Sequence, residues 1–295
     1  MNVGIIDVGS NTIRLLLASV QGAQLRVLEE RTAWIRLGAD ISSDGVISDA
    51  RLAAAARAVA GFATEARRRG CVRLETLVAS PGRQAENGTE LLRRLETASQ
   101  TTVRVLRRDD EARLAYEGAV ACMRVDAPTV AVCDVGGGST QLAVGIPGRG
   151  PSWVRSIDIG SLRLTTQAFE HDPPGKKAVT AARGLVREHF DGLALPLPKE
   201  ALVVGGSARG LRRLLGVRAL GAEELEQAMR VLRKRPSADV AAEHGIDPQR
   251  ARTLLAGALI LSEVQLRLVI PLAVGRGGVR EGAALELAAQ QLSAA

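Results

Sequence analysis

The chain has 295 residues, enough for about two domains of ordinary size, and 46% of them are hydrophobic. No uninterrupted apolar run reaches the roughly 18 residues that a membrane span needs, so a globular chain with no membrane partner is expected. The formal net charge is +7, and all but four of the 39 basic residues are arginine, whose planar fork donates two hydrogen bonds to a phosphate at once. This charge favours a polyanionic partner, although arginines on solvated helix faces would give the same count.

Several other classes of partner and site are not expected. Aromatic residues make up only 2% of the chain, too few for the stacking platforms of single-strand binders, so nucleic acid is not expected as a partner. The three cysteines are dispersed and the three histidines lack metal-ligand spacing, so neither a disulfide framework nor a zinc site is indicated. The N-terminus leads directly into an apolar run without a cationic start, which predicts a cytoplasmic protein without a signal peptide.

The first part of the chain alternates strands and helices. Apolar runs predict strands near residues 2–8, 12–20, 24–37 and 74–80, with a short strand near Val103. Alanine- and leucine-rich helical spacing predicts helices over residues 48–69, 87–99 and 109–124. Asp126-Ala127-Pro128 then interrupts the pattern.

After this break the same order of elements begins again. Strands are predicted near residues 129–135, 140–146, 152–158 and 201–204, with helices near 160–170 and 176–190. Long helical runs close the chain over residues 247–268 and 279–292, and we interpret their Ala, Leu and Arg pattern as core and solvated faces without chemistry. Both halves thus start with strand, acidic turn, strand, which predicts two related α/β units.

The two acidic turns carry the clearest chemical signal. Asp7-Val8-Gly9-Ser10-Asn11-Thr12 follows the first apolar run, and Asp134-Val135-Gly136-Gly137-Gly138-Ser139-Thr140 follows the run that starts the second half. Glycine lets backbone N–H groups approach an anion, hydroxyl and amide side chains add donors, and an aspartate at a strand end can hold a hard cation. A dinucleotide fingerprint and a P-loop lysine are both missing, so the pair of turns predicts another kind of phosphate site.

At this point the chain resembles a known family. The resemblance is to the Ppx/GppA exopolyphosphatase and guanosine pentaphosphate phosphohydrolase family, of the actin/hexokinase/Hsp70 superfamily. It rests on the two turns and on further motifs in the same order along the chain: Arg14-Leu15, Glu111-Ala112-Arg113-Leu114 with Gly118, Gly205-Gly206-Ser207, and Arg280-Glu281-Gly282. It implies an α/β protein of two ribonuclease-H-like (actin-like ATPase) domains that face an interdomain cleft. The predicted domains are residues 1–125 and 126–280, with a final helix at 281–295 that packs back on the first.

The resemblance also implies an activity and site residues. The expected reaction is release of terminal orthophosphate from inorganic polyphosphate, and of phosphate from guanosine pentaphosphate, with Mg²⁺ as cofactor; a homodimer is a further possibility. Glu111 is the implied catalytic base that deprotonates a water, whereas the sequence alone allows Asp110 equally, or helix capping for both. Asp134 is the implied metal ligand, with Asp7 and Gln141 beside it. The implied phosphate-binding residues are Gly9, Ser10, Asn11, Thr12, Arg14, Arg83, Gly136, Gly137, Gly138, Ser139, Thr140, Gly206 and Ser207. For Arg83 surface solvation is the alternative, and Arg14 points either at the phosphate site or across its sheet.

Two departures from the family pattern keep other functions open. Gln141 stands where the family usually has a metal-linked glutamate, and Arg107-Arg108 precede the acidic helix start where the family commonly has Ser-Gly. The loss of charge at Gln141 motivates a second hypothesis, a catalytically weak polyphosphate or alarmone sensor. A third is an ATP-using small-molecule kinase of the same superfamily, against which Glu111 argues, because a water-activating carboxylate would waste ATP.

Overall fold

The structure is a computed structural model that describes residues 1–293, and its contacts divide the chain into two compact units. Unit 1 comprises residues 1–124 together with the chain from Gly277 onward, and unit 2 comprises Val125–Arg276. Residues 277–280, which the sequence analysis placed in the second domain, therefore lie in unit 1. In residues 1–293 no helix is both long enough and apolar enough for a membrane span.

Unit 1 is built on a five-stranded mixed sheet in the order β3-β2-β1-β4-β5. β1 and β2 form a hairpin around the first acidic turn, β3 extends it antiparallel, and β4 and β5 add in parallel on the other side. The strands are β1 (Asn2–Val8), β2 (Thr12–Gln21), β3 (Gln24–Trp34), β4 (Arg73–Val78) and β5 (Val103–Val105).

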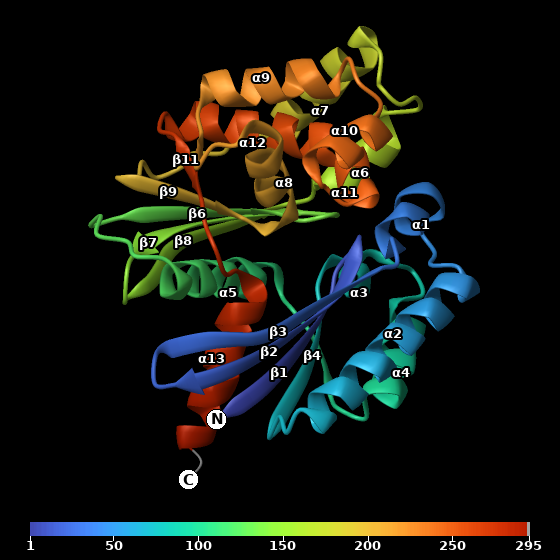
Figure 1. Cartoon of the computed structure of the whole chain (residues 1–295), viewed down its shortest axis with the longest axis vertical. Helices are drawn as coiled ribbons and strands as arrows, with labels where there is room; N and C mark the ends of the chain where they lie inside the picture. Colours follow the sequence, from blue (N-terminus) through green and yellow to red (C-terminus); the bar gives the residue numbers. More distant parts are fainter. Residues whose placement is uncertain (294–295) are drawn as a thin grey trace. The chain divides into compact units, whose positions relative to one another are not determined.

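Helices cover both faces of this sheet (Figure 1). α2 (Asp49–Arg68) and α4 (Gly88–Ser99) pack on the face to which β1 directs Ile6 and Val8. α5 (Arg108–Cys122) and α13 (Val279–Ser293) pack on the opposite face, to which β1 directs Val3 and Ile5. The short helices α1 (Leu37–Asp44) and α3 (Ser80–Gln84) follow β3 and β4. Since side chains alternate along a strand, Asp7 shares the face of α5 and α13.

Unit 2 contains a six-stranded sheet in the order β10-β11-β9-β6-β7-β8. β6 and β7 form the hairpin around the second acidic turn, and β9 pairs with β6 in parallel. The strands are β6 (Val130–Val135), β7 (Thr140–Ile146), β8 (Gly150–Ile157), β9 (Glu200–Val204), β10 (Ala219–Leu220) and β11 (Leu272–Val274).

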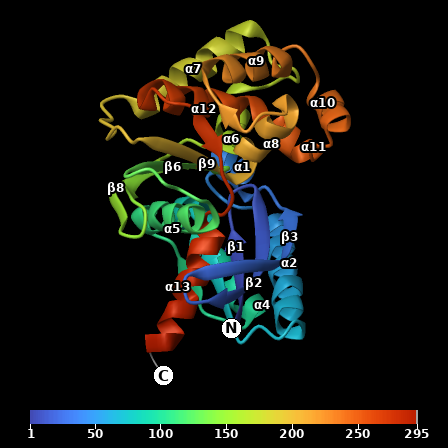
Figure 2. The same ribbon diagram turned by 60° about the vertical axis from the view of Figure 1, so that its left-hand side comes forward.

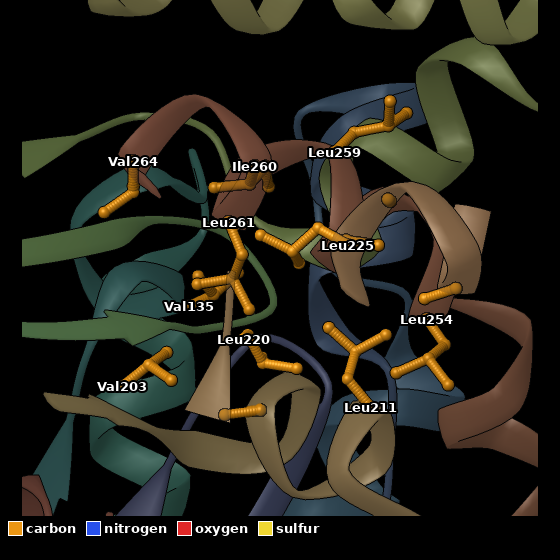
Figure 3. Close-up of a cluster of buried hydrophobic side chains, with 14 of the residues drawn as sticks. Val135, Val203, Leu211, Leu220, Leu225, Leu254, Leu259, Ile260, Leu261 and Val264 are labelled. Carbon is orange, nitrogen blue, oxygen red and sulfur yellow. The ribbon is translucent and has the colours of Figure 1, made fainter. Parts of the chain in front are cut away.

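The helices of unit 2 gather on one side of its sheet, around the buried helix α12 (Figure 2). Leu211, Leu225 and Leu259, from three different helices, meet strand residues such as Val203 in this core (Figure 3). The helices are α6 (Ser161–Ala168), α7 (Lys176–Phe190), α8 (Gly205–Leu215), α9 (Ala222–Leu232), α10 (Ser237–His244), α11 (Pro248–Arg252) and α12 (Leu254–Leu268).

The predicted elements differ from the structure mainly in short segments. The strand predicted to residue 37 ends at Trp34, because the amides of Ile35 and Arg36 donate to the carbonyl of Asn11 and turn the chain into α1. The helix predicted over residues 247–268 is broken at Thr253, whose hydroxyl donates to the carbonyl of Arg250. The strands β10 and β11 were missed because two or three residues are too few to show a period.

Candidate functional site

The first acidic turn is a three-residue hairpin loop that α1 braces from one side. The amide of Gly9 donates to the carbonyl of Thr12 at 3.0 Å and closes the hairpin. The carbonyl of Ser10 accepts from the amide of Gly38, in the first turn of α1, at 2.8 Å. Because a trans peptide points its C=O and N–H in opposite directions, the amide of Asn11 is directed away from α1.

The side chains of this loop are buried but incompletely hydrogen-bonded. Ser10 shares a 2.6 Å hydrogen bond with the hydroxyl of Ser80, at the start of α3. Asn11 is only 4% exposed, and neither its amide nitrogen nor its carbonyl oxygen has a hydrogen-bond partner in the described residues. Burying such a group without a partner costs about 1–3 kcal/mol, so the side chain of Asn11 does not stabilise the fold through hydrogen bonds.

Glu111 lies in the first turn of α5, only 7% exposed. Its Oε2 accepts a hydrogen bond from the guanidinium of Arg83 at 2.8 Å. Arg83 is fixed in turn by a 2.5 Å hydrogen bond from its second terminal nitrogen to the carbonyl of Leu106. The alternative of surface solvation is therefore wrong for Arg83, whose side chain is 15% exposed and holds the Glu111 carboxylate in one orientation.

Asp110, which the sequence alone allowed equally, has a different environment. Its side chain is 41% exposed and lies 3.9 Å from the guanidinium of Arg113, one turn along the same helix. An exposed ion pair of this kind stabilises a helix weakly and leaves the carboxylate in water. The geometry therefore separates the two acids, with Glu111 buried and oriented and Asp110 solvated.

Asp7 and Arg14 face each other on β1 and β2, where their Cα atoms are paired in the sheet register. Their carboxylate and guanidinium groups are 3.6 Å apart, and Asp7 is 6% exposed. Arg14 therefore lies beside the first loop, on the face of the sheet that carries α5 and α13. The Asp7 carboxylate already has this cationic neighbour.

The second acidic turn repeats the design of the first. The amide of Gly136 donates to the carbonyl of Ser139 at 3.0 Å and closes the hairpin. The carbonyls of Gly136 and Gly137 accept from the first amides of α6, so the N–H groups of Gly137 and Gly138 point away from that helix. A row of such amides is an anion-binding concavity. Gly160 packs so closely behind it that a Cβ there would lie 2.5–2.6 Å from backbone atoms of Gly137 and Gly138.

The donors around Asp134 suit a hard cation such as Mg²⁺. Asp134 and Gln141 are directly paired on β6 and β7, so their side chains share one face. The amide nitrogen of Gln141 donates to the hydroxyls of Ser139 at 2.8 Å and Ser156 at 3.3 Å, and its carbonyl oxygen takes no part in these bonds. Gly205 lies so near the Asp134 carboxylate that a Cβ would overlap it. No group of three or more His, Cys, Asp or Glu side chains is arranged as a metal site within residues 1–293, and Mg²⁺ usually takes only one or two carboxylates.

Three of the predicted phosphate-binding groups have other roles. The N–H groups of Gly9 and Gly136 close their hairpins, as described above. The hydroxyl of Thr140 donates to the carbonyl of Ile159 at 2.6 Å. The side chain of Ser207 is fully buried and packs against Gly257 of α12, and its hydroxyl has no hydrogen-bond partner in the described residues. Its backbone amide lies in the first turn of α8, where amides are open to an anion.

One residue that sequence reasoning missed lies beside Gly206. The guanidinium of Arg250 covers this glycine so closely that a Cβ there would overlap it. Arg250 lines a pocket of about 230 Å³ in unit 2, together with Arg209 and Arg213. Residues 247–268 were expected to form core and solvated helix faces, because one arginine in an amphipathic pattern is typical of a solvated face. The feature of the sequence that could have pointed to Arg250 is the pair Gly205-Gly206 at the start of α8. Two residues without side chains leave room for a large side chain to pack against them.

Comparisons with known proteins identify relatives of this chain. The model of the Ppx/GppA phosphatase family matches residues 16–291. Exopolyphosphatase 1 of Mycobacterium leprae is 28% identical over 283 residues, which span 90% of this chain and 83% of that protein.

Solved structures show the fold. A Ppx/GppA family member from Aquifex aeolicus has a TM-score of 0.82 at 23% identity and covers 99% of this chain and 98% of its own. A solved exopolyphosphatase-like protein has a TM-score of 0.90 at 24% identity, with the same coverage. The predicted α/β class with two actin-like domains is confirmed.

Proposed function

The chain belongs to the Ppx/GppA phosphatase family and is a phosphoanhydride hydrolase, and we propose that it releases terminal orthophosphate from inorganic polyphosphate. Guanosine pentaphosphate is proposed as a second substrate, because it carries the same kind of terminal anhydride. The exopolyphosphatases among the curated relatives support the first substrate. The basic charge of the chain supports a polyanion in general.

The observation that carries the proposal is the buried pair of Glu111 and Arg83. Hydrolysis needs a base that takes a proton from the attacking water, and it must be held in one orientation to do so. The 2.8 Å hydrogen bond from Arg83 gives the Glu111 carboxylate that orientation. Arg83 is itself held in place by its hydrogen bond to the carbonyl of Leu106. We propose that Glu111 accepts the proton while the water oxygen bonds to the terminal phosphorus and the anhydride P–O bond breaks.

We propose phosphate contacts for each unit taken by itself. In unit 1 we propose the amide and side chain of Asn11 and the guanidinium of Arg14. In unit 2 we propose the amides of Gly137 and Gly138 and those at the start of α8. Such preorganised donors stabilise charge that spreads over the phosphate oxygens during transfer.

We propose that Asp134 and the carbonyl oxygen of Gln141 hold Mg²⁺. Bound Mg²⁺ would neutralise charge on the phosphate oxygens. The hydrogen bonds from Gln141 to Ser139 and Ser156 support this role, because they fix the amide plane and leave the oxygen as the ligand atom. These hydrogen bonds favour a working hydrolase over the alternative of a weak sensor. In a sensor that no longer uses a metal ion, nothing would require the amide of Gln141 to be held in one orientation.

The test compares Glu111→Gln with Asp110→Asn in a phosphate-release assay with Mg²⁺. The assay uses pyrophosphate, short and long polyphosphate, guanosine pentaphosphate and ATP. We expect Glu111→Gln to lower kcat by about 10²–10⁴-fold, the usual contribution of a general base. Asp110→Asn, one residue earlier in the same helical turn, should change kcat less than about twofold, because the solvated carboxylate of Asp110 takes no part.

Two results would overturn the proposal. One is that wild-type protein releases phosphate from none of these substrates. The other is that the two variants lose activity equally, which would assign the effect to the helix start rather than to the base.

A further inference from the structure

The start of α1, which braces the first acidic turn, begins in an unusual backbone conformation. Arg36, the residue before the helix, has φ 59° and ψ 42°, in the left-handed region. A residue with a long side chain adopts this region only at a cost in free energy, so contacts with its surroundings must hold Arg36 there. The conformation of Arg36 sets the direction in which α1 leaves β3.

The position of the first loop depends on this direction. The amides of Ile35 and Arg36 donate to the carbonyl of Asn11 at 3.3 and 3.0 Å. The amide of Gly38 donates to the carbonyl of Ser10 at 2.8 Å, and a Cβ at Gly38 would lie only 2.7 Å from the Cβ of Ser10. The carbonyl of Ser10 shares a peptide plane with the amide of Asn11, the proposed phosphate donor of this loop. A change at Arg36 would therefore turn that amide.

Arg51, in the first turn of α2, contacts both Arg36 and α1. Its terminal nitrogen Nη1 donates a hydrogen bond to the carbonyl of Arg36. The same nitrogen lies 2.8 Å from Oδ1 of Asp40 on α1. The other carboxylate oxygen of Asp40 accepts from the amide and the hydroxyl of Ser48, the residue before α2, at 3.0 and 2.7 Å. One cationic nitrogen thus ties the residue before α1 to a carboxylate that is itself fixed.

The fold of α2 does not depend on this contact. Leu52, Ala55 and Val59 are buried and hold the helix on its sheet. The side chain of Arg51 is 30% exposed, and a hydrogen bond from a charged donor to a carbonyl is stronger than one from a neutral donor. We propose that Arg51 is a positioning residue, which holds the carbonyl of Arg36 and thereby keeps the amide of Asn11 directed at the substrate phosphate; this inference rests on the proposed function.

The test is Arg51→Met in the full-length protein, which keeps the apolar stem and removes both polar contacts. KM and kcat for polyphosphate are measured by phosphate release. We expect KM to rise by about 3- to 10-fold and kcat to change less than about twofold, because a contact made equally to bound substrate and transition state affects KM alone. The matched control is Arg57→Met, at an exposed position of the same helix, which should change neither value.

Two further variants keep these contacts in part. In Arg51→Lys, KM should rise by less than about twofold, because both contacts of Arg51 are made by one nitrogen and an ammonium group carries three donors. Asp40→Asn weakens the ion pair but keeps an oxygen for Ser48, so it should fold and raise KM by about 2-fold.

A change at Arg36 shows whether Arg51 acts through it. Glycine adopts the left-handed region without strain, so in Arg36→Gly this conformation no longer depends on Arg51. Adding Arg51→Met to Arg36→Gly should therefore change KM by less than about twofold. Hydrogen exchange gives a readout that needs no activity. The amide of Gly38 should exchange at least about 5-fold faster in Arg51→Met than in the wild-type protein or in Arg57→Met.

The inference is overturned if Arg51→Met leaves KM unchanged, or if Arg57→Met raises KM as much as Arg51→Met does. It is equally overturned if Arg51→Met raises KM to the same extent in the Arg36→Gly background, or if it leaves the exchange of the Gly38 amide unchanged. If the wild-type protein hydrolyses nothing, the proposed function fails instead. Hydrogen exchange at Gly38 and the Kd for polyphosphate then measure the positioning effect in the same variants.

Discussion

At the scale of single residues, Asn11 is the phosphate contact of the proposed site that differs most from an ordinary buried residue. Its side chain is buried with both polar atoms unpaired, whereas Asn87 in the same unit exchanges two hydrogen bonds with the backbone of Ile47, at 3.0 and 2.8 Å. The side chain of Asn11 thus lowers the stability of the fold, whereas that of Asn87 contributes to it.

Replacing Asn11 by alanine is expected to stabilise the protein and to weaken substrate binding. Removing an unpaired buried amide should raise the free energy of unfolding by about 1 kcal/mol and the melting temperature by about 2–4 °C. The KM for polyphosphate should rise, because the proposed phosphate contact is lost. Thermal unfolding and phosphate release measure the two effects separately.

The control for this prediction is Asn87→Ala. It should lower the free energy of unfolding by about 1–3 kcal/mol, since it leaves backbone groups of Ile47 unpaired, and it should leave KM unchanged. Destabilisation of Asn11→Ala without a change in KM would contradict the prediction and make Asn11 a structural residue.

The residue types of the proposed site could be predicted from the sequence, but the orientations of their side chains could not. Placing Asp7 and Asp134 at strand ends needed only the apolar runs before them. Separating Glu111 from Asp110 needed Arg83, which lies 28 residues away along the chain. The orientation of Ser207 is equally non-local, because its side chain, in the first turn of α8, packs against Gly257, 50 residues later.

At the scale of elements, each acidic turn is braced by the start of a helix. Carbonyl groups of the first loop accept hydrogen bonds from amides at the start of α1. Carbonyl groups of the second loop accept hydrogen bonds from amides at the start of α6. The first amides of each helix thereby gain hydrogen-bond acceptors, and the N–H groups of the loop point away from that helix. The internal repeat seen in the sequence thus extends to how the loops are held. α1 was not predicted from the sequence, because its eight residues follow β3 directly and no turn residues or change of hydrophobic pattern mark where the strand ends.

Gly160 is the residue on which the second loop rests, and Gly160→Ala is expected to lower activity by about 10- to 100-fold. The backbone of Gly160 is extended, with φ −137°, so alanine is not strained there and the effect comes from displacing Gly137 and Gly138. A shift of about 1 Å in a phosphate-binding loop is enough for such a loss. The phosphate-release assay measures it.

Gly184→Ala is the matched control, in the interior of α7, where a Cβ meets no atom within 4 Å. It should raise the free energy of unfolding by about 0.5–1 kcal/mol through helix propensity and leave activity unchanged. Full activity of Gly160→Ala would show that the second loop tolerates displacement, and it would remove its amides from the proposed site.

At the scale of the whole molecule, the two units depend differently on chain continuity. The core of unit 2 lies entirely within residues 131–274. Unit 1 needs both ends of the chain, because four buried residues of α13 complete the core on one face of its sheet: Ala283, Ala284, Leu287 and Ala288. A sequence pattern shows that such a helix is amphipathic, but not which sheet it covers.

This difference predicts how fragments fold. Residues 125–276 should fold alone with a cooperative urea transition, since they contain their own core. Residues 1–124 alone should fail to fold, because one sheet face is left uncovered. Joining 1–124 to 277–295 through a short Gly-Ser linker should restore folding, since Gly277 packs against Cys122, two residues before the first segment ends. Circular dichroism and urea unfolding of the three fragments test this. If residues 1–124 unfold at the same urea concentration with and without 277–295, α13 contributes nothing to the stability of unit 1.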